Sequence, residues 1–129
     1  MKLKLHQVID GFITLKKLVE LKDSKLPVKL AYAVARNYRI LQPEAATFDE
    51  NHQDIYKELG TKIVTNNGQD AWSAGDNSNE INKRVNDLLL TEIEVNVHTI
   101  RLEHMGDTFS AGDMLSLDWM VDEDKKETE

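Results

Sequence analysis

Residues suited to binding an anion recur at helical spacing in the N-terminal third of the chain. They follow one another at steps of three, four and three positions, and they are Lys29, Tyr32, Arg36 and Arg39. This spacing places them on one face of a helix. A guanidinium group holds a phosphate through paired hydrogen bonds, and an aromatic ring offers a base a surface for stacking. The pattern indicates a site for a small anionic nucleotide ligand or for an acidic protein surface, although a solvated helix face carries the same residues.

Trp72 is a second candidate for a contact with a ligand or partner. It lies in a stretch rich in Gly, Asn and Asp, between residues 66 and 78. A lone tryptophan among polar loop residues often packs on something outside its own hairpin. We therefore expect Trp72 to take part in binding.

Catalytic chemistry has little support in the residue patterns. The chain has no cysteine, which excludes a thiol nucleophile, a disulfide scaffold and a zinc ribbon. Nucleophile-elbow, P-loop and dinucleotide-binding motifs do not occur. The four histidines, His6, His52, His98 and His104, have no metal-ligand spacing, and on a strand the last two would lie ~20 Å apart. The sequence predicts a protein that is not an enzyme and that holds no metal or cofactor.

Charge is divided unevenly along the chain. The formal net charge is −7, yet residues 1–42 carry nine basic and three acidic side chains, a net charge of +6, so residues 43–129 carry −13. This polarity fits either an anion site in the first part or head-to-tail attraction between copies of the protein. It disfavours binding to duplex nucleic acid, because the acidic part would repel phosphates.

Two amphipathic helices are predicted in the first half of the chain. Apolar residues recur at steps of three and four from Leu5 to Leu21, and a second periodic segment runs from Pro27 to Leu59. Pro43 lies inside the second segment, where it removes a backbone hydrogen bond, so we expect a kink near residues 39–43 or a break into two helices. Gly60 is expected to cap the second helix.

The second predicted helix is too long for the first to cover. At 1.5 Å per residue it would reach ~50 Å, whereas the first helix would reach only ~25 Å. The apolar seam after Pro43 must be buried by the C-terminal half or by another protomer. We expect the latter, a homo-oligomer and most simply a two-fold dimer, with an interface that includes Phe48, His52, Ile55 and Leu59.

The C-terminal half is predicted to consist of short strands and short helices. Residues 61–73 resemble a hairpin around an Asn-Gly turn, and Asn77 with Glu80 forms a capping-box pattern that opens a helix. Residues 92–102 alternate as a central strand, with a change of parity near Thr99. Ser110 with Asp113 suggests a second capping box, before a final helix that carries Met114, Leu117 and Val121.

The predicted fold class is α+β and α-rich. Residues 1–121 form a single domain, in which residues 1–60 are a helical hairpin with a long kinked second helix and residues 61–121 are a small mixed part with a few antiparallel strands. Residues 122–129 have the composition of a disordered charged tail. No run of 18 apolar residues and no signal peptide can be recognised, so the expected location is the cytoplasm, with no membrane as partner.

Three segments of the chain carry a resemblance to a known family. They are LPVKLAYAVARNYRIL (26–41), LLLTEIEVNVHTIRLEHM (88–105) and the SxxDMLSLDWMV ending (110–121). With these segments the chain resembles a family of small uncharacterised proteins, a domain of unknown function, encoded by phages and prophages of Gram-positive bacteria. The resemblance carries over no catalytic residue. It implies a phage accessory or virion-associated protein that is made in the cytoplasm of the host bacterium.

Two functions agree with these expectations. The first is a non-catalytic binding protein that blocks or sequesters a host factor, either a defence protein or a nucleotide signal. It is supported by the lack of catalytic motifs and by the basic face around Arg36. The alternative is a structural or assembly protein of the virion or tail, which is supported by the unshared part of the apolar seam and by the charge polarity.

Overall fold

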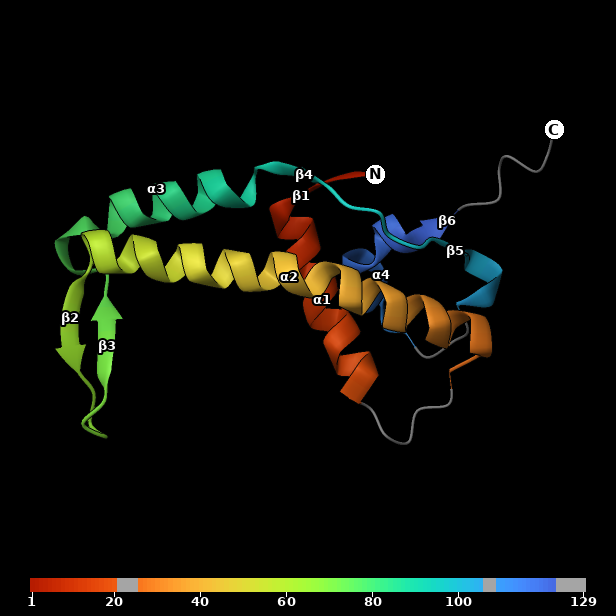
Figure 1. The fold of residues 1–129 in the computed structure, drawn as a ribbon, viewed down its shortest axis with the longest axis horizontal. Coiled ribbons are helices and arrows are strands. Elements are labelled where there is room, and N and C mark those ends of the chain that lie inside the picture. Colours follow the sequence, from red (N-terminus) through yellow and green to blue (C-terminus); the bar gives the residue numbers. More distant parts are fainter. Residues whose placement is uncertain (21–25, 106–108, 123–129) are drawn as a thin grey trace.

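The computed structural model describes residues 1–20, 26–105 and 109–122 (Figure 1). Its elements fall into two parts, which we call the body and the arm. The arm comprises residues 43–89, namely the second half of the longest helix, a hairpin and the helix that follows it. The body comprises the other described residues. The α-rich α+β class and the N-terminal helix pair are confirmed.

The helix pair is α1 (Leu5–Glu20) and α2 (Val28–Leu59). Pro27 stands immediately before α2, where the fixed φ of proline suits the start of a helix. The two helices cross in the body, where the rings of Phe12 and Tyr38 stack at 5.2 Å between centroids. Of the two outcomes expected at Pro43, a kink or a break into two helices, the break does not occur, because α2 runs through this residue as a single helix.

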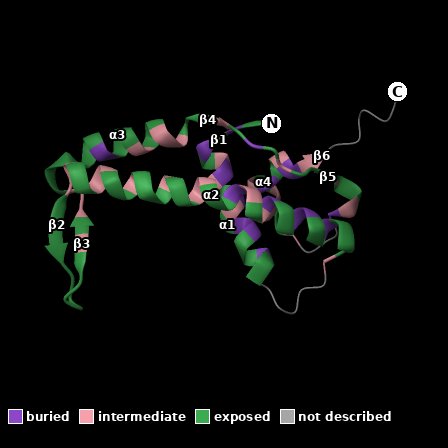
Figure 2. Cartoon of the chain, viewed as in Figure 1, coloured by how far each residue is buried: buried purple, intermediate pink, exposed green. Residues whose placement is uncertain are grey.

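The hydrophobic core lies in the body. Its fully buried members come from α1, from the first half of α2 and from the C-terminal elements, and they include Val8, Leu15, Leu30, Leu41, Met105, Leu117 and Met120. Buried residues, drawn in purple in Figure 2, are concentrated there, whereas the arm is mostly exposed or half-buried. In the arm, Ile81 is the one side chain among the described residues that is fully buried.

In the arm, the predicted hairpin follows α2 and is formed by β2 (Thr61–Val64) and β3 (Asp70–Ser73). Gly68 closes its turn with φ of 77°, a conformation that glycine adopts without strain. Gly60 ends α2 in an extended conformation and not as a left-handed cap, and a Cβ there would lie 2.5 Å from the Ser73 carbonyl oxygen. Position 60 therefore requires a glycine, because β3 approaches it too closely for a side chain to fit.

After a short turn, η1 (Gly75–Asn77), helix α3 (Ser78–Leu89) returns along the second half of α2 (Figure 1). The expected capping box of Asn77 and Glu80 is wrong. The Asn77 side chain instead donates a 2.6 Å hydrogen bond to the Leu59 carbonyl at the end of α2, and Glu80 pairs with Arg84. Asn77 thus ties the start of α3 to the end of α2.

The predicted central strand over residues 92–102 is wrong. Instead, β4 (Glu92–Glu94) pairs antiparallel with β1 (Lys2–Lys4), and β5 (Ile100–Arg101) pairs parallel with β6 (Val121–Asp122). The residues between β4 and β5 form no strand. The change of parity near Thr99 therefore separates two strands with different partners.

The C-terminal helix is shorter than expected. Helix α4 spans Ala111–Ser116 and opens with the predicted capping box, in which the Ser110 hydroxyl accepts from the Asp113 N–H at 3.1 Å. The chain then passes through η3 (Asp118–Met120) into β6, so Val121 lies in a strand and not in the helix. Of the predicted charged tail, residues 123–129 lie outside the described residues.

Candidate functional site

The first half of α2 borders a pocket of about 350 Å³, which we call the basic pocket. The opposite wall comes from the segment before β5, from β5 and from η2 (Leu102–His104). The pocket is lined by Lys29, Tyr32, His98, Thr99, Ile100, Arg101 and His104. Two of the four predicted anion-binding residues, Lys29 and Tyr32, therefore meet an arginine, two histidines and a threonine hydroxyl from a distant part of the chain.

Tyr32 is the aromatic wall of the basic pocket. Its side chain is about half exposed, and its ring meets the His98 imidazole edge to face, with 5.6 Å between ring centroids. Arg36 does not line the pocket, but its Nη1 donates a 3.0 Å hydrogen bond to the Tyr32 hydroxyl, and its Cζ lies 5.6 Å from the ring centroid. Arg36 thus orients the ring and adds a cation beside it.

Asn37 holds the opposite wall against α2. It is fully buried, its Nδ2 donates to the His98 carbonyl at 2.8 Å, and its Oδ1 accepts from the His98 N–H at 2.7 Å. A buried amide with both polar ends satisfied fixes the backbone that it binds. In the sequence, Asn37 is recognisable as a polar residue at a position of the helix that is expected to be buried. Our interpretation of the sequence did not identify it as a site residue.

Glu103 is an acidic neighbour of the basic pocket. The Glu103 carboxylate lies 3.5 Å from Arg101 Nε and 3.6 Å from His104 Nε2, and its side chain is 58 % exposed. His98 and His104 line the same pocket because the chain turns in η2, so the separation expected of a strand does not hold. An exposed carboxylate of this kind can turn away when another anion enters.

Arg39 and Trp72 are not in the basic pocket. Arg39 is exposed one turn further along α2. Trp72 lies on β3 opposite Lys62, is 38 % exposed, and belongs to the arm (Figure 1). The structure therefore does not bring Trp72 together with the predicted anion-binding face.

The predicted interface residues lie on the side of α2 that faces the body and α3. All four, Phe48, His52, Ile55 and Leu59, are half-buried. Phe48 packs against the core cluster and stacks on His52 at 5.6 Å between centroids. Because the chain itself covers part of this seam, the seam is not a fully open surface.

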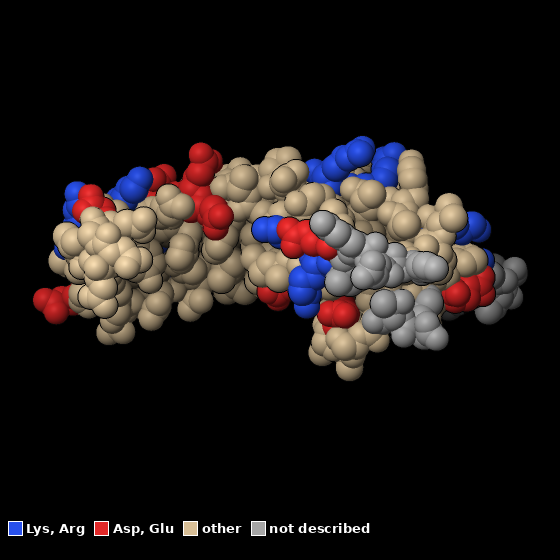
Figure 3. Space-filling view, turned by 90° about the horizontal axis from the view of Figure 1, so that it is seen from below, with Lys and Arg blue, Asp and Glu red and all other residues tan. Residues whose placement is uncertain are grey.

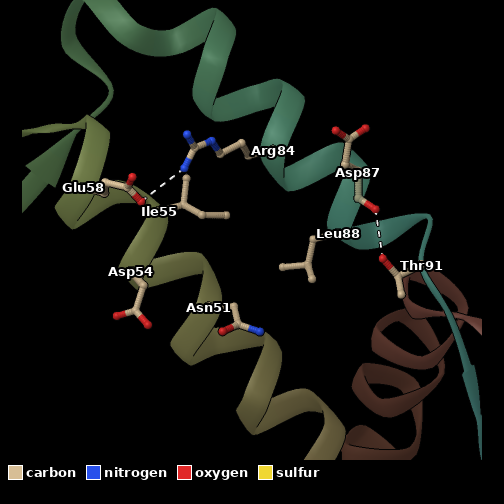
Figure 4. A pocket seen from close by; sticks show the side chains of 8 residues that line it. All are labelled: Asn51, Asp54, Ile55, Glu58, Arg84, Asp87, Leu88 and Thr91. Atoms are coloured by element: carbon tan, nitrogen blue, oxygen red, sulfur yellow. Dashed lines mark hydrogen bonds and ion pairs between the residues drawn. The ribbon is translucent and has the colours of Figure 1, made fainter.

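A second pocket, of about 450 Å³, opens between α2 and α3 (Figure 4). Ile55 and Leu88 form its apolar floor, and the polar residues around it are Asn51, Asp54, Glu58, Arg84, Asp87 and Thr91. Hydrogen bonds from Arg84 to Glu80 and Glu58 raise the pKa of Arg84 above its ordinary value. The pair with Glu58, at 3.2 Å, links the two helices across the pocket.

Within the ranges that the structure describes, no group of three or more His, Asp or Glu side chains is placed to hold a metal ion. In those ranges no helix is long and apolar enough to cross a membrane. No protein-family model, no curated protein and no solved structure matches the chain.

Proposed function

We propose that the protein is a non-catalytic phage accessory protein that binds a nucleotide in the basic pocket and thereby sequesters it in the cytoplasm of the host bacterium. The observation that carries this proposal is the convergence of Lys29, Tyr32 and Arg101 from two distant segments on one pocket. The phage origin rests on the family resemblance.

The side chains of the basic pocket match the parts of a nucleotide. Lys29 and Arg101 are cations that attract phosphate, and Thr99 offers a hydroxyl. Tyr32 presents a half-exposed ring on which a base can stack. The volume of about 350 Å³ is near the lower end of the range of ligand pockets, which favours a small ligand over a large one.

Isothermal titration with ATP, with inorganic phosphate and with adenosine tests the proposal. We expect ATP to bind. Inorganic phosphate should bind more weakly because it lacks the base, and adenosine should bind more weakly because it lacks the phosphate groups. Lys29→Ala should weaken ATP binding about tenfold, as the loss of one charge-assisted hydrogen bond. Lys57→Ala, which removes an exposed lysine from the arm, is the matched control and should leave ATP binding unchanged.

Glu103 supplies a second, opposite test. Because its carboxylate occupies the neighbourhood of Arg101 and His104, Glu103→Gln should strengthen ATP binding. Failure of ATP to bind at about millimolar concentration, or equal effects of Lys29→Ala and Lys57→Ala, would overturn the proposal. Mass spectrometry of protein purified under native conditions would identify a retained nucleotide.

The alternative function, assembly of the virion or tail, is favoured by a different observation. The arm extends beyond the core and has few buried side chains of its own (Figure 2). The arm also exposes Ile63, Val64 and Trp72, and exposed apolar side chains of this kind can mark a contact with a neighbour in an assembly. Detection of the protein in purified virions by mass spectrometry would support assembly, and its presence only in the infected cell would support sequestration of a host factor or nucleotide.

A further inference from the structure

The side of α2 that faces away from the body and α3 is uncovered along its whole length. Residues spaced three and four apart on this side are all exposed, and we call them the outer face: Ala35, Arg39, Gln42, Ala46, Glu50, Gln53 and Lys57. Figure 2 shows exposed residues along α2 from the body to the arm. The outer face is distinct from the half-buried seam of Phe48 and Ile55.

Charge changes sign halfway along this side of α2. In the first half the outer face carries Arg39, and between Val28 and Leu41 the helix contains no acidic residue. After the midpoint come Glu50 and, at the edge of this face, Asp49, which make no ion pair within the part of the chain that the structure describes, and Lys57 follows near the end of the helix. In the face drawn in Figure 3, blue and red groups lie over both the body and the arm. The middle of the outer face, with Arg39 before the midpoint and Asp49 and Glu50 after it, is electrically complementary to itself when turned end to end.

We propose that the outer face binds the outer face of a second copy, with the two α2 helices antiparallel about a two-fold axis. If the axis crosses α2 near Glu44, the midpoint of the helix, position 39 of one copy lies opposite position 49 of the other. Arg39 then meets Asp49 twice in the dimer, because a two-fold axis repeats every contact.

Two further features of α2 suit this arrangement. Ala35 and Ala46 are small side chains on either side of Glu44, so the two helices can approach closely. Antiparallel helices also place the positive end of one macrodipole beside the negative end of the other. A copy in the parallel orientation would instead oppose basic to basic and acidic to acidic residues. The charge pattern thus selects one orientation.

Charge reversal tests the proposal without knowledge of the detailed contacts. Arg39→Glu makes both halves of the outer face acidic, and the double variant Asp49→Lys/Glu50→Lys makes both halves basic. Each variant alone should form homodimers about tenfold more weakly than the natural chain, because like charges meet at both contacts. An equimolar mixture should form a heterodimer, since both contacts are then attractive.

Sedimentation velocity at about 50 mM and about 500 mM NaCl measures these equilibria, and salt should weaken the natural dimer by screening. Lys83→Glu, an exposed charge reversal on α3, is the matched control and should leave the dimer unchanged. The proposal is overturned if the natural chain is monomeric at about 100 µM or if the mixture does not associate. All of the substituted side chains are exposed, so the variants should fold.

The dimer and the nucleotide site can fail separately. Arg39 and Asp49 do not line the basic pocket, so ATP titration of the Arg39→Glu variant measures that pocket independently. Loss of the dimer with unchanged ATP binding would support this inference. Absence of ATP binding with an intact dimer would reject the nucleotide site alone.

Discussion

The pair of hydrogen bonds between Asn37 and His98 allows a quantitative prediction. Asn37→Leu replaces the amide by an apolar side chain of similar size, so the hydrogen bonds of 2.7 and 2.8 Å are lost without a large cavity. Each neutral hydrogen bond contributes about 1 kcal/mol net, and a partly buried group left without a partner costs more. The variant should therefore lose about 2–3 kcal/mol of unfolding free energy.

Chemical denaturation with both fluorescence and circular dichroism measures this loss. A change of about 2–3 kcal/mol in a chain of this size should lower the melting temperature by about 6–12 °C. The matched control is Asn51→Leu, which removes an exposed asparagine from the same helix and should change the unfolding free energy by less than about 0.5 kcal/mol. The variant should also bind ATP more weakly, because the wall that carries His98 is no longer held.

A loss of less than about 0.5 kcal/mol in Asn37→Leu would refute the reasoning. It would mean that water satisfies the His98 backbone as well as Asn37 does. The pocket wall would then be held by other contacts, such as the burial of Val95 and Ile100 on either side of it.

Three other substitutions have defined outcomes. Gly11→Ala places a Cβ 2.7 Å from Cζ2 of Trp119, so we expect a loss of about 1–3 kcal/mol in denaturation. Ser110→Ala removes the hydroxyl of the capping box and should cost about 1 kcal/mol in the same measurement. Arg36→Ala removes an exposed side chain and should change unfolding by less than about 1 kcal/mol, yet it should weaken ATP binding about tenfold because it frees the Tyr32 ring. Equal affinity in Arg36→Ala and the natural chain would show that the ring needs no support.

Local patterns in the sequence predicted the helices and the hairpin well. The periodicity from Leu5 onward and the one after Pro27 each correspond to a helix, because an amphipathic stripe depends on residues within a few turns. The turn at Gly68 and the cap at Ser110 were likewise predicted from residues next to each other in the chain.

Features that depend on distant partners were missed or misread. The strand over residues 92–102 was predicted from alternation alone, but its first part pairs with the N-terminal residues and its last part with Val121. Asn77 matched a capping pattern, yet its side chain binds the end of the preceding helix. For the site, Lys29 and Tyr32 were identified from helical spacing, whereas the opposite wall at His98 could not be inferred from it.

The unequal burial of the body and the arm has a consequence for local unfolding. Helix α2 joins a part that contains the core cluster to a part in which, among the described residues, Ile81 is the one fully buried side chain. Opening the arm exposes little apolar surface, so its free energy of local opening is much smaller than that of the body. Amide hydrogens beyond Leu41 should therefore exchange with solvent through opening of the arm alone, while those between Leu30 and Leu41 exchange only when the whole chain unfolds. The amide hydrogens of a single continuous helix would then show two levels of protection from exchange, with the boundary near the midpoint of the helix.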